Sequence, residues 1–133
     1  MSSARPADVV DLDAALGEQL LHIPVRQSYR SVLIDVRAAG VGNWDELARI
    51  GTWQIGGPPP MALGVVASGI VTAIGEDVGW LAVGDEVLVH TLPLKRNGTW
   101  AERVLAPVAA VAPKPASADF ELAAAFPVPA LTA

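Results

Sequence analysis

The chain has 133 residues, which is enough for one domain with its own core, and 52% of them are hydrophobic while 17% are charged, a balance that argues against disorder. The net charge of −5 disfavours a nucleic-acid binder, and the nine Lys and Arg residues form no run that would favour an anionic membrane surface. The absence of cysteine excludes disulfides and thiolate chemistry and fits a reducing compartment. Since the sequence shows neither a signal peptide nor an apolar run of about 20 residues, we expect a cytoplasmic protein with no membrane partner.

Residues 1–30 are the least regular part of the sequence and are predicted to be a divergent N-terminal arm or strand. Within them, residues 7–21 could form an amphipathic helix, or a frayed arm could lead into a strand at 19–25. Residues 31–38 alternate apolar side chains with others, which predicts a half-buried strand.

A short helix is predicted over residues 43–50, after a loop bracketed by glycines. Asn43 at the N-cap, with Glu46 three residues later, forms a capping-box pattern. Gly51 follows the last helical residue, where glycine commonly ends a helix in the left-handed conformation.

Short strands and tight turns dominate the middle of the chain. From residue 63, two apolar runs surround a Ser-Gly pair at 68–69, and turns are expected at 75–79 and 83–86. In the second of these turns the carboxylate of Asp85 is expected to accept backbone N–H bonds. Further strands are predicted at 87–89, 99–105 and 108–112, with a hairpin turn at 95–98.

Near the C-terminus, Ser117 is placed to cap a helix over residues 118–126, with Asp119 and Glu121 near its positive end. Six or seven short strands and two small helices, without regular alternation between the two, are typical of a barrel-like β domain. The sequence therefore predicts a mainly β, partly open barrel over residues 31–117.

The glycines and apolar residues of the central segment follow one spaced pattern, which is more specific than any single member. In chain order it consists of Leu63-Gly64, Gly69, Val71, Gly75, Val78, Gly84-Asp85 and Val87. This pattern resembles the N-terminal, GroES-like barrel of the medium-chain dehydrogenase/reductases. The resemblance continues in collinear order through Ala38-Ala39-Gly40-Val41, Asp45, residues 98–102, Pro113-Lys114-Pro115, residues 121–125 and Leu131-Thr132-Ala133. It covers about residues 31–133.

Zinc-dependent members of that family carry a Cys after the Ala-Ala-Gly-Val strand and a His-Glu pair after the Leu-Gly. Here the corresponding positions hold Gly42, Val65 and Val66, so the thiolate and imidazole ligands of a catalytic zinc are missing. The two histidines, His22 and His90, lie far apart in sequence and are interpreted as ordinary polar positions. We therefore expect no metal site.

The chain is more similar to the zinc-independent branch, of quinone oxidoreductase and enoyl reductase type. This resemblance implies hydride transfer from NADPH to a quinone or an activated C=C, with an acceptor pocket that maps onto Gly42, Asn43, Trp44 and Trp53. Two interpretations stay open: Asn43 could bond substrate or nicotinamide or simply cap its helix, and the tryptophans could wall an apolar pocket or pack in the core. The chain departs from the branch at Gly42, where an Asn is common.

Thr132 matches a family threonine that approaches the nicotinamide, which makes residues 118–133 a helix and the start of a hinge to a Rossmann domain. Such a domain is marked by GxGxxG between a strand and a helix, and the 133 residues contain no GxGxxG. The chain, as a fragment, truncated product or split-enzyme component, is thus expected to be inactive without that domain. The alternative hypothesis is a non-enzymatic GroES-like binding module that forms homo-oligomers through its exposed surface.

Overall fold

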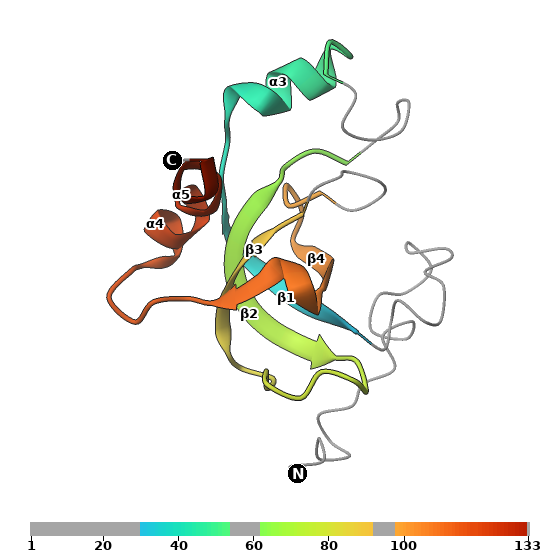
Figure 1. The fold of residues 1–133 in the computed structure, drawn as a ribbon, viewed down its shortest axis with the longest axis vertical. Helices are drawn as coiled ribbons and strands as arrows, with labels where there is room; N and C mark the ends of the chain where they lie inside the picture. The colour runs from blue at the N-terminus through green and yellow to red at the C-terminus, as the bar shows by residue number, and fades with distance from the viewer. Residues whose placement is uncertain (1–29, 54–61, 92–97, 133) are drawn as a thin grey trace.

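The computed structural model describes residues 30–53, 62–91 and 98–132. In this part of the chain five strands form one antiparallel sheet with the order β4-β1-β2-β3-β5. The sheet curls into an open half-barrel (Figure 1), which confirms the prediction of a mainly β, partly open barrel. The strands are β1 (Ser31–Ala39), β2 (Val66–Ile74), β3 (Glu86–His90), β4 (Arg103–Pro107) and β5 (Val111–Pro113).

The main core consists of aliphatic side chains contributed by all five strands and by the turn between β2 and β3. Residues two apart on a strand share a face, as Val32 and Ile34 do on β1 and Val87 and Val89 do on β3. Most members are β-branched, which suits the extended backbone, and burying each such side chain contributes roughly 1.5–3 kcal/mol. The buried members are Val32, Ile34, Ala67, Val71, Ile74, Val78, Leu81, Val87, Val89, Val104, Ala106 and Val111.

Strand β2 is continuous through Gly69, so the prediction of two runs around residues 68–69 is wrong. Gly69 pairs with Val36 of β1 and with Val87 of β3. A Cβ on Gly69 would lie 2.1 Å from the carbonyl oxygen of Asp35. The glycine therefore allows close approach of two strands rather than a turn.

Two further strand predictions are wrong at their boundaries. The strand expected at 99–105 begins only at Arg103, because Thr99 is held elsewhere: its N–H donates to the carbonyl of Gly64 (3.0 Å) and its hydroxyl to that of Val66 (2.9 Å). The strand expected at 108–112 begins as a 3-10 turn, η2 (Val108–Ala110), and only then continues as β5.

Within residues 30–53, 62–91 and 98–132, three short α-helices accompany the sheet: α3 (Asn43–Arg49), α4 (Phe120–Ala125) and α5 (Pro127–Thr132). The cap of α4 is Asp119 rather than Ser117, since its Oδ1 accepts from the Leu122 N–H at 2.8 Å. Helix α5 is not predicted from the sequence. Its first residue is Pro127, which fits there because proline lacks an N–H and the N–H of a first helical residue has no intrahelical acceptor in any case. Helix α4 packs on β1 and β2, and α5 lies beside it and contacts β3 (Figure 1).

Other local predictions are confirmed. Gly51 follows α3 with φ 79°, and the N–H of Val78 closes the turn onto the carbonyl of Gly75 (3.1 Å). The carboxylate of Asp85 accepts from the N–H of Ala82 at 2.9 Å. The predictions for residues 1–29 and most of the 95–98 turn lie outside the described residues. No helix in the described ranges has both the length and the apolarity to cross a bilayer.

Candidate functional site

The loop between β1 and α3 is built around a backbone cap. Gly42 is the N-cap of α3, and its N–H donates to Oδ2 of Asp45 at 2.9 Å, while the Asp45 N–H donates back to the Gly42 carbonyl at 3.1 Å. Asp45 is only 1% exposed. The predicted capping box of Asn43 and Glu46 is thus wrong by one residue. Gly42 and Asp45 form it instead, because Oδ2 of the buried Asp45 accepts the N–H of Gly42.

The indole of Trp44 covers Gly42. A Cβ on Gly42 would lie 2.2 Å from two ring carbons of Trp44, so the ring occupies the space that a side chain at position 42 would need. The same ring packs against Val65 and Val66 at the start of β2, where Val128 of α5 joins them. We call Trp44, Val65, Val66 and Val128 the Trp44 cluster.

Two buried polar atoms beside the Trp44 cluster have no hydrogen-bond partner: Nε1 of Trp44, a donor, and Oδ1 of Asp45, an acceptor. Buried polar groups are nearly always hydrogen-bonded, and an unmade bond in an apolar surrounding costs about 1–3 kcal/mol. The two atoms stand on adjacent residues, Trp44 within the Trp44 cluster and Asp45 next to it in the chain.

A second tryptophan, Trp100, bonds the backbone of the loop that leads to Gly42. Trp100 Nε1 donates to the carbonyl of Gly40 at 3.0 Å, although the side chain is half exposed. The Thr99 hydroxyl donates to the Val66 carbonyl, and Thr99 is fully buried. These bonds tie the segment before β4 to both sides of the Trp44 cluster.

The sequence-predicted residues fall into two groups. Gly42 and Trp44 lie together in or beside the cluster, whereas Asn43 is exposed at the first position of α3. Trp53 lies past the other end of α3, is 43% exposed and is not part of the cluster. The Thr132 hydroxyl is exposed and donates within α5 to the carbonyl of Val128 at 2.8 Å.

The titratable groups near the site are few. His90 pairs with Val66 across β3 and β2, so both side chains share one face of the sheet. Burial lowers the pKa of His90 below its ordinary value, because desolvation disfavours the imidazolium form. Among the described residues no three His, Cys, Asp or Glu side chains gather as a metal site.

Sequence reasoning missed Asp45, Trp100 and Val128 as parts of this region. Asp45 and Trp100 lie within the family-like motifs, but a motif does not say which buried atoms lack partners. Val128 joins the cluster only through the packing of α5, for which the sequence carries no local signal.

Comparison with known proteins agrees with this architecture. Residues 28–116 match the alcohol dehydrogenase GroES-like domain family. The chain is 37% identical over 102 residues to a synaptic vesicle membrane protein VAT-1 homolog from Danio rerio, covering 77% of this chain and 20% of that protein. It is 38% identical over 112 residues to a quinone oxidoreductase from Sus scrofa, covering 84% and 32%. The crystal structure of Escherichia coli quinone oxidoreductase complexed with NADPH aligns with a TM-score of 0.69 and 27% identity, over 85% of this chain and 33% of that one.

The chain thus spans between 20% and 33% of the length of these relatives. The family match covers all five strands of the curled sheet and ends before α4 and α5. By this match the chain belongs to the alcohol dehydrogenase GroES-like domain family, as an oxidoreductase-type domain of the quinone oxidoreductase-like medium-chain dehydrogenase/reductases.

Proposed function

We propose that this chain forms the substrate side of a zinc-independent, NADPH-dependent oxidoreductase that reduces a quinone or an activated C=C by hydride transfer. The observation that carries the proposal is the packing of Trp44 over Gly42 and onto Val65 and Val66. At Gly42, Val65 and Val66 the chain thus offers an apolar surface, where a zinc site would need thiolate or imidazole ligands.

The chain's own part in the reaction is to bind and orient the acceptor. An apolar surface with one unpartnered donor, Nε1 of Trp44, suits a planar molecule with a carbonyl oxygen. Orientation of this kind is a main contribution of the protein in cofactor-dependent hydride transfer. We assign Gly42 and Trp44 to the pocket itself, and Asn43 and Trp53 to its rim.

NADPH supplies the hydride when it is bound. The 133 residues contain no GxGxxG, and the Thr132 hydroxyl is used within its helix, so the residues in hand do not fit a dinucleotide site by themselves. We therefore assign NADPH binding to a Rossmann domain that works with this one, and we expect the 133 residues alone to be inactive. The NADPH-bound relative supports the choice of cofactor. The absence of cysteine supports a cytoplasmic location.

The test uses the purified chain, whose four tryptophans report acceptor binding by fluorescence quenching. We expect 1,4-naphthoquinone to quench the wild type and the control Trp80→Ala, whose exposed indole is not assigned to the pocket, and to quench Trp44→Ala much less. NADPH should neither bind to the chain nor be oxidised by it. A chimera with the nucleotide-binding half of a related quinone oxidoreductase should oxidise NADPH in the presence of a chelator. Binding of NADPH by the isolated chain, or equal quenching in all variants, would contradict the proposal.

A second candidate function is a binding module that self-associates, and one observation favours it. Leu122 on α4, Leu131 on α5 and Phe126 between the two helices are 59%, 73% and 56% exposed, which places large apolar side chains on one pair of adjacent helices. Light scattering separates the two candidates: a stable homo-oligomer that does not bind naphthoquinone favours the module, and a quinone-binding monomer favours the enzyme domain.

A further inference from the structure

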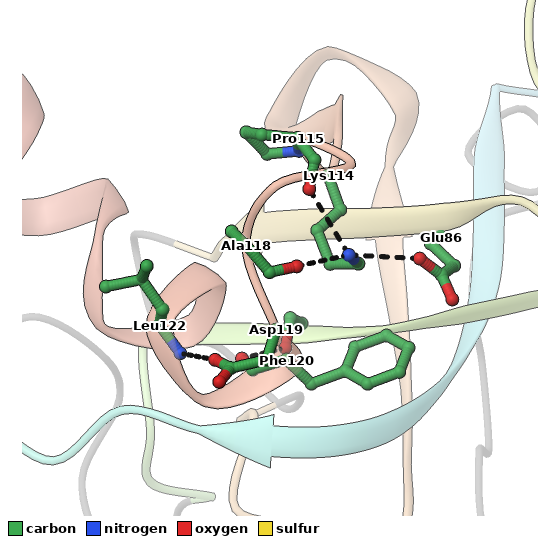
Figure 2. A network of polar contacts seen from close by, with 8 residues as sticks. Glu86, Lys114, Pro115, Ala118, Asp119, Phe120 and Leu122 are labelled. Atoms are coloured by element: carbon green, nitrogen blue, oxygen red, sulfur yellow. Dashed lines mark hydrogen bonds and ion pairs between the residues drawn. The ribbon is translucent and has the colours of Figure 1, made fainter.

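Lys114 is a charged side chain buried between the sheet and the C-terminal helices. It follows β5, and its side chain is only 5% exposed. As Figure 2 shows, its Nζ donates to the carbonyl oxygens of Ala118 (2.5 Å) and Pro115 (3.3 Å) and lies 3.0 Å from Oε2 of Glu86. Each of the three ammonium donors therefore has an acceptor.

The partners of Lys114 lie on two separate parts of the fold. Glu86 begins β3, whereas Pro115 and Ala118 belong to the turn that leads into α4. The ring of Phe120, the first residue of α4, lies with its centroid 5.3 Å from Nζ, within the range of a cation–π contact. Lysine is rarely buried without such partners, so the side chain joins the turn to the sheet.

A second side chain holds the same turn. The hydroxyl of Ser68 on β2 donates to the carbonyl of Phe120 at 2.5 Å, and Ser68 is fully buried. Lys114 thus satisfies the carbonyls of Pro115 and Ala118 in the turn, and Ser68 bonds the carbonyl of Phe120, the first residue of α4. The start of α4 is thus fixed from β2 as well as from β3.

The position of α4 determines where α5 lies, since one helix follows the other with only Phe126 between them. Val128 of α5 packs against the buried pair Val65 and Val66, on which Trp44 also packs. A shift of the turn at residues 115–119 would therefore move Val128 relative to the other members of the Trp44 cluster.

We propose that Lys114 is a positioning residue: its ammonium holds α4 and α5 on the sheet and so places Val128 against Val65 and Val66 of the Trp44 cluster. The proposal rests on the proposed function only where it relates the cluster to acceptor binding. The placement of the helices is tested without acceptor or cofactor, so failure of either proposal can be recognised separately.

The experiment measures distances between nitroxide labels, for which the cysteine-free chain is well suited. One pair, Asp77→Cys with Ala130→Cys, joins a turn of the sheet to α5. The control pair, Asp77→Cys with Glu102→Cys, joins two exposed positions beside the strands. Lys114→Met keeps the aliphatic stem and removes the donors, and it should broaden the 77–130 distance distribution at least about twofold while the 77–102 distribution keeps its width.

Lys114→Arg separates positioning from simple filling of space. Its guanidinium can donate to the same acceptors, so the 77–130 distribution should return toward the wild-type width. An unchanged 77–130 distribution in Lys114→Met would overturn the proposal. Equal broadening of both pairs would also overturn it, because Lys114 would then support the whole domain.

Hydrogen exchange gives a second measurement if Lys114→Met does not fold. In Lys114→Gln the amide can keep only part of the contacts. The Ala123 N–H, which donates to the Asp119 carbonyl inside α4, should then exchange about tenfold faster, while the Val71 N–H in β2 keeps its rate. Equal rates at Ala123 in wild type and variant would contradict the proposal.

Discussion

Two apolar clusters among the described residues differ in whether their polar atoms find hydrogen-bond partners. The main core between the strands consists of aliphatic side chains alone. The Trp44 cluster, in contrast, buries an indole N–H without an acceptor, and an unpartnered carboxylate oxygen of Asp45 lies on the next residue. The main core contains only groups whose burial stabilises the fold. The region of the Trp44 cluster carries the free-energy cost of hydrogen bonds that are not made, which is typical of a region used for binding.

The two clusters also use glycine differently. Gly69 in the sheet faces backbone, whereas Gly42 faces the ring of Trp44. A backbone neighbour cannot move without disturbing the strand pairing, but a half-buried side chain can rotate. Substitutions at the two glycines therefore measure how rigid each region is.

The largest effect is expected for Gly69→Ala. The new Cβ would lie 2.1 Å from the Asp35 carbonyl oxygen, so β1 and β2 would have to separate, at a cost of about 3 kcal/mol in the free energy of unfolding. Urea denaturation measures this loss. Gly79→Ala is the matched control, because nothing lies within 4 Å of its Cβ position, and it should leave the midpoint nearly unchanged. A loss equal to that of the control would show that the sheet is as adaptable as the site.

A smaller effect is expected for Gly42→Ala. The Cβ collides with the indole of Trp44, and rotation of that ring should limit the loss to about 1–2 kcal/mol. In the Trp44→Ala background the same substitution should cost almost nothing, so a double-mutant cycle should give a coupling energy of about 1–2 kcal/mol. Trp53→Ala, at the far end of α3, serves as the control background and should leave the cost of Gly42→Ala unchanged. Purely additive losses for residues 42 and 44 would contradict the observed packing.

The smallest effect concerns His90 and pH. Because the pKa of His90 is below its ordinary value of 6.5 in the folded protein, the unfolded chain binds the proton more readily. Stability contributed by the neutral imidazole is therefore fully present above about pH 6.5 and declines as the pH falls toward the lowered pKa. Urea midpoints between pH 5 and 8 should show a shallower decline in His90→Gln than in the wild type, with parallel behaviour above pH 7. The same acid-side slope in both proteins would show that His90 does not carry this dependence.

Much of the sheet could be predicted from sequence because its signals are local. Alternation over residues 31–38 reports a half-buried strand, and glycine and aspartate at 84–85 report a turn; both are observed. The errors occurred where distant residues intervene. Thr99 lies outside β4 because its N–H and hydroxyl donate to the carbonyls of Gly64 and Val66. Gly69 lies within β2, where the backbone of β1 at Asp35 comes too close for a side chain.

The candidate site was less predictable for the same reason. Sequence motifs point to the loop at residues 42–44, and the structure brings Gly42 and Trp44 together with Val65 and Val66. They did not reveal that the ring of Trp44 takes the place of a side chain at residue 42. The pocket roles of Gly42, Asn43, Trp44 and Trp53 and the cofactor-binding role of Thr132 remain predictions.

The sequence by itself determined the class of the domain, because spaced glycines and β-branched runs are properties of single positions and their order. The tertiary structure decided what those positions do. It buried Asp45 and Lys114, left one polar atom of Asp45 unpartnered and gave every donor of Lys114 a partner. The physical reason is that burial and hydrogen bonding depend on which segments meet in space, and residues such as Ser68 and Phe120 meet across 52 positions of the chain.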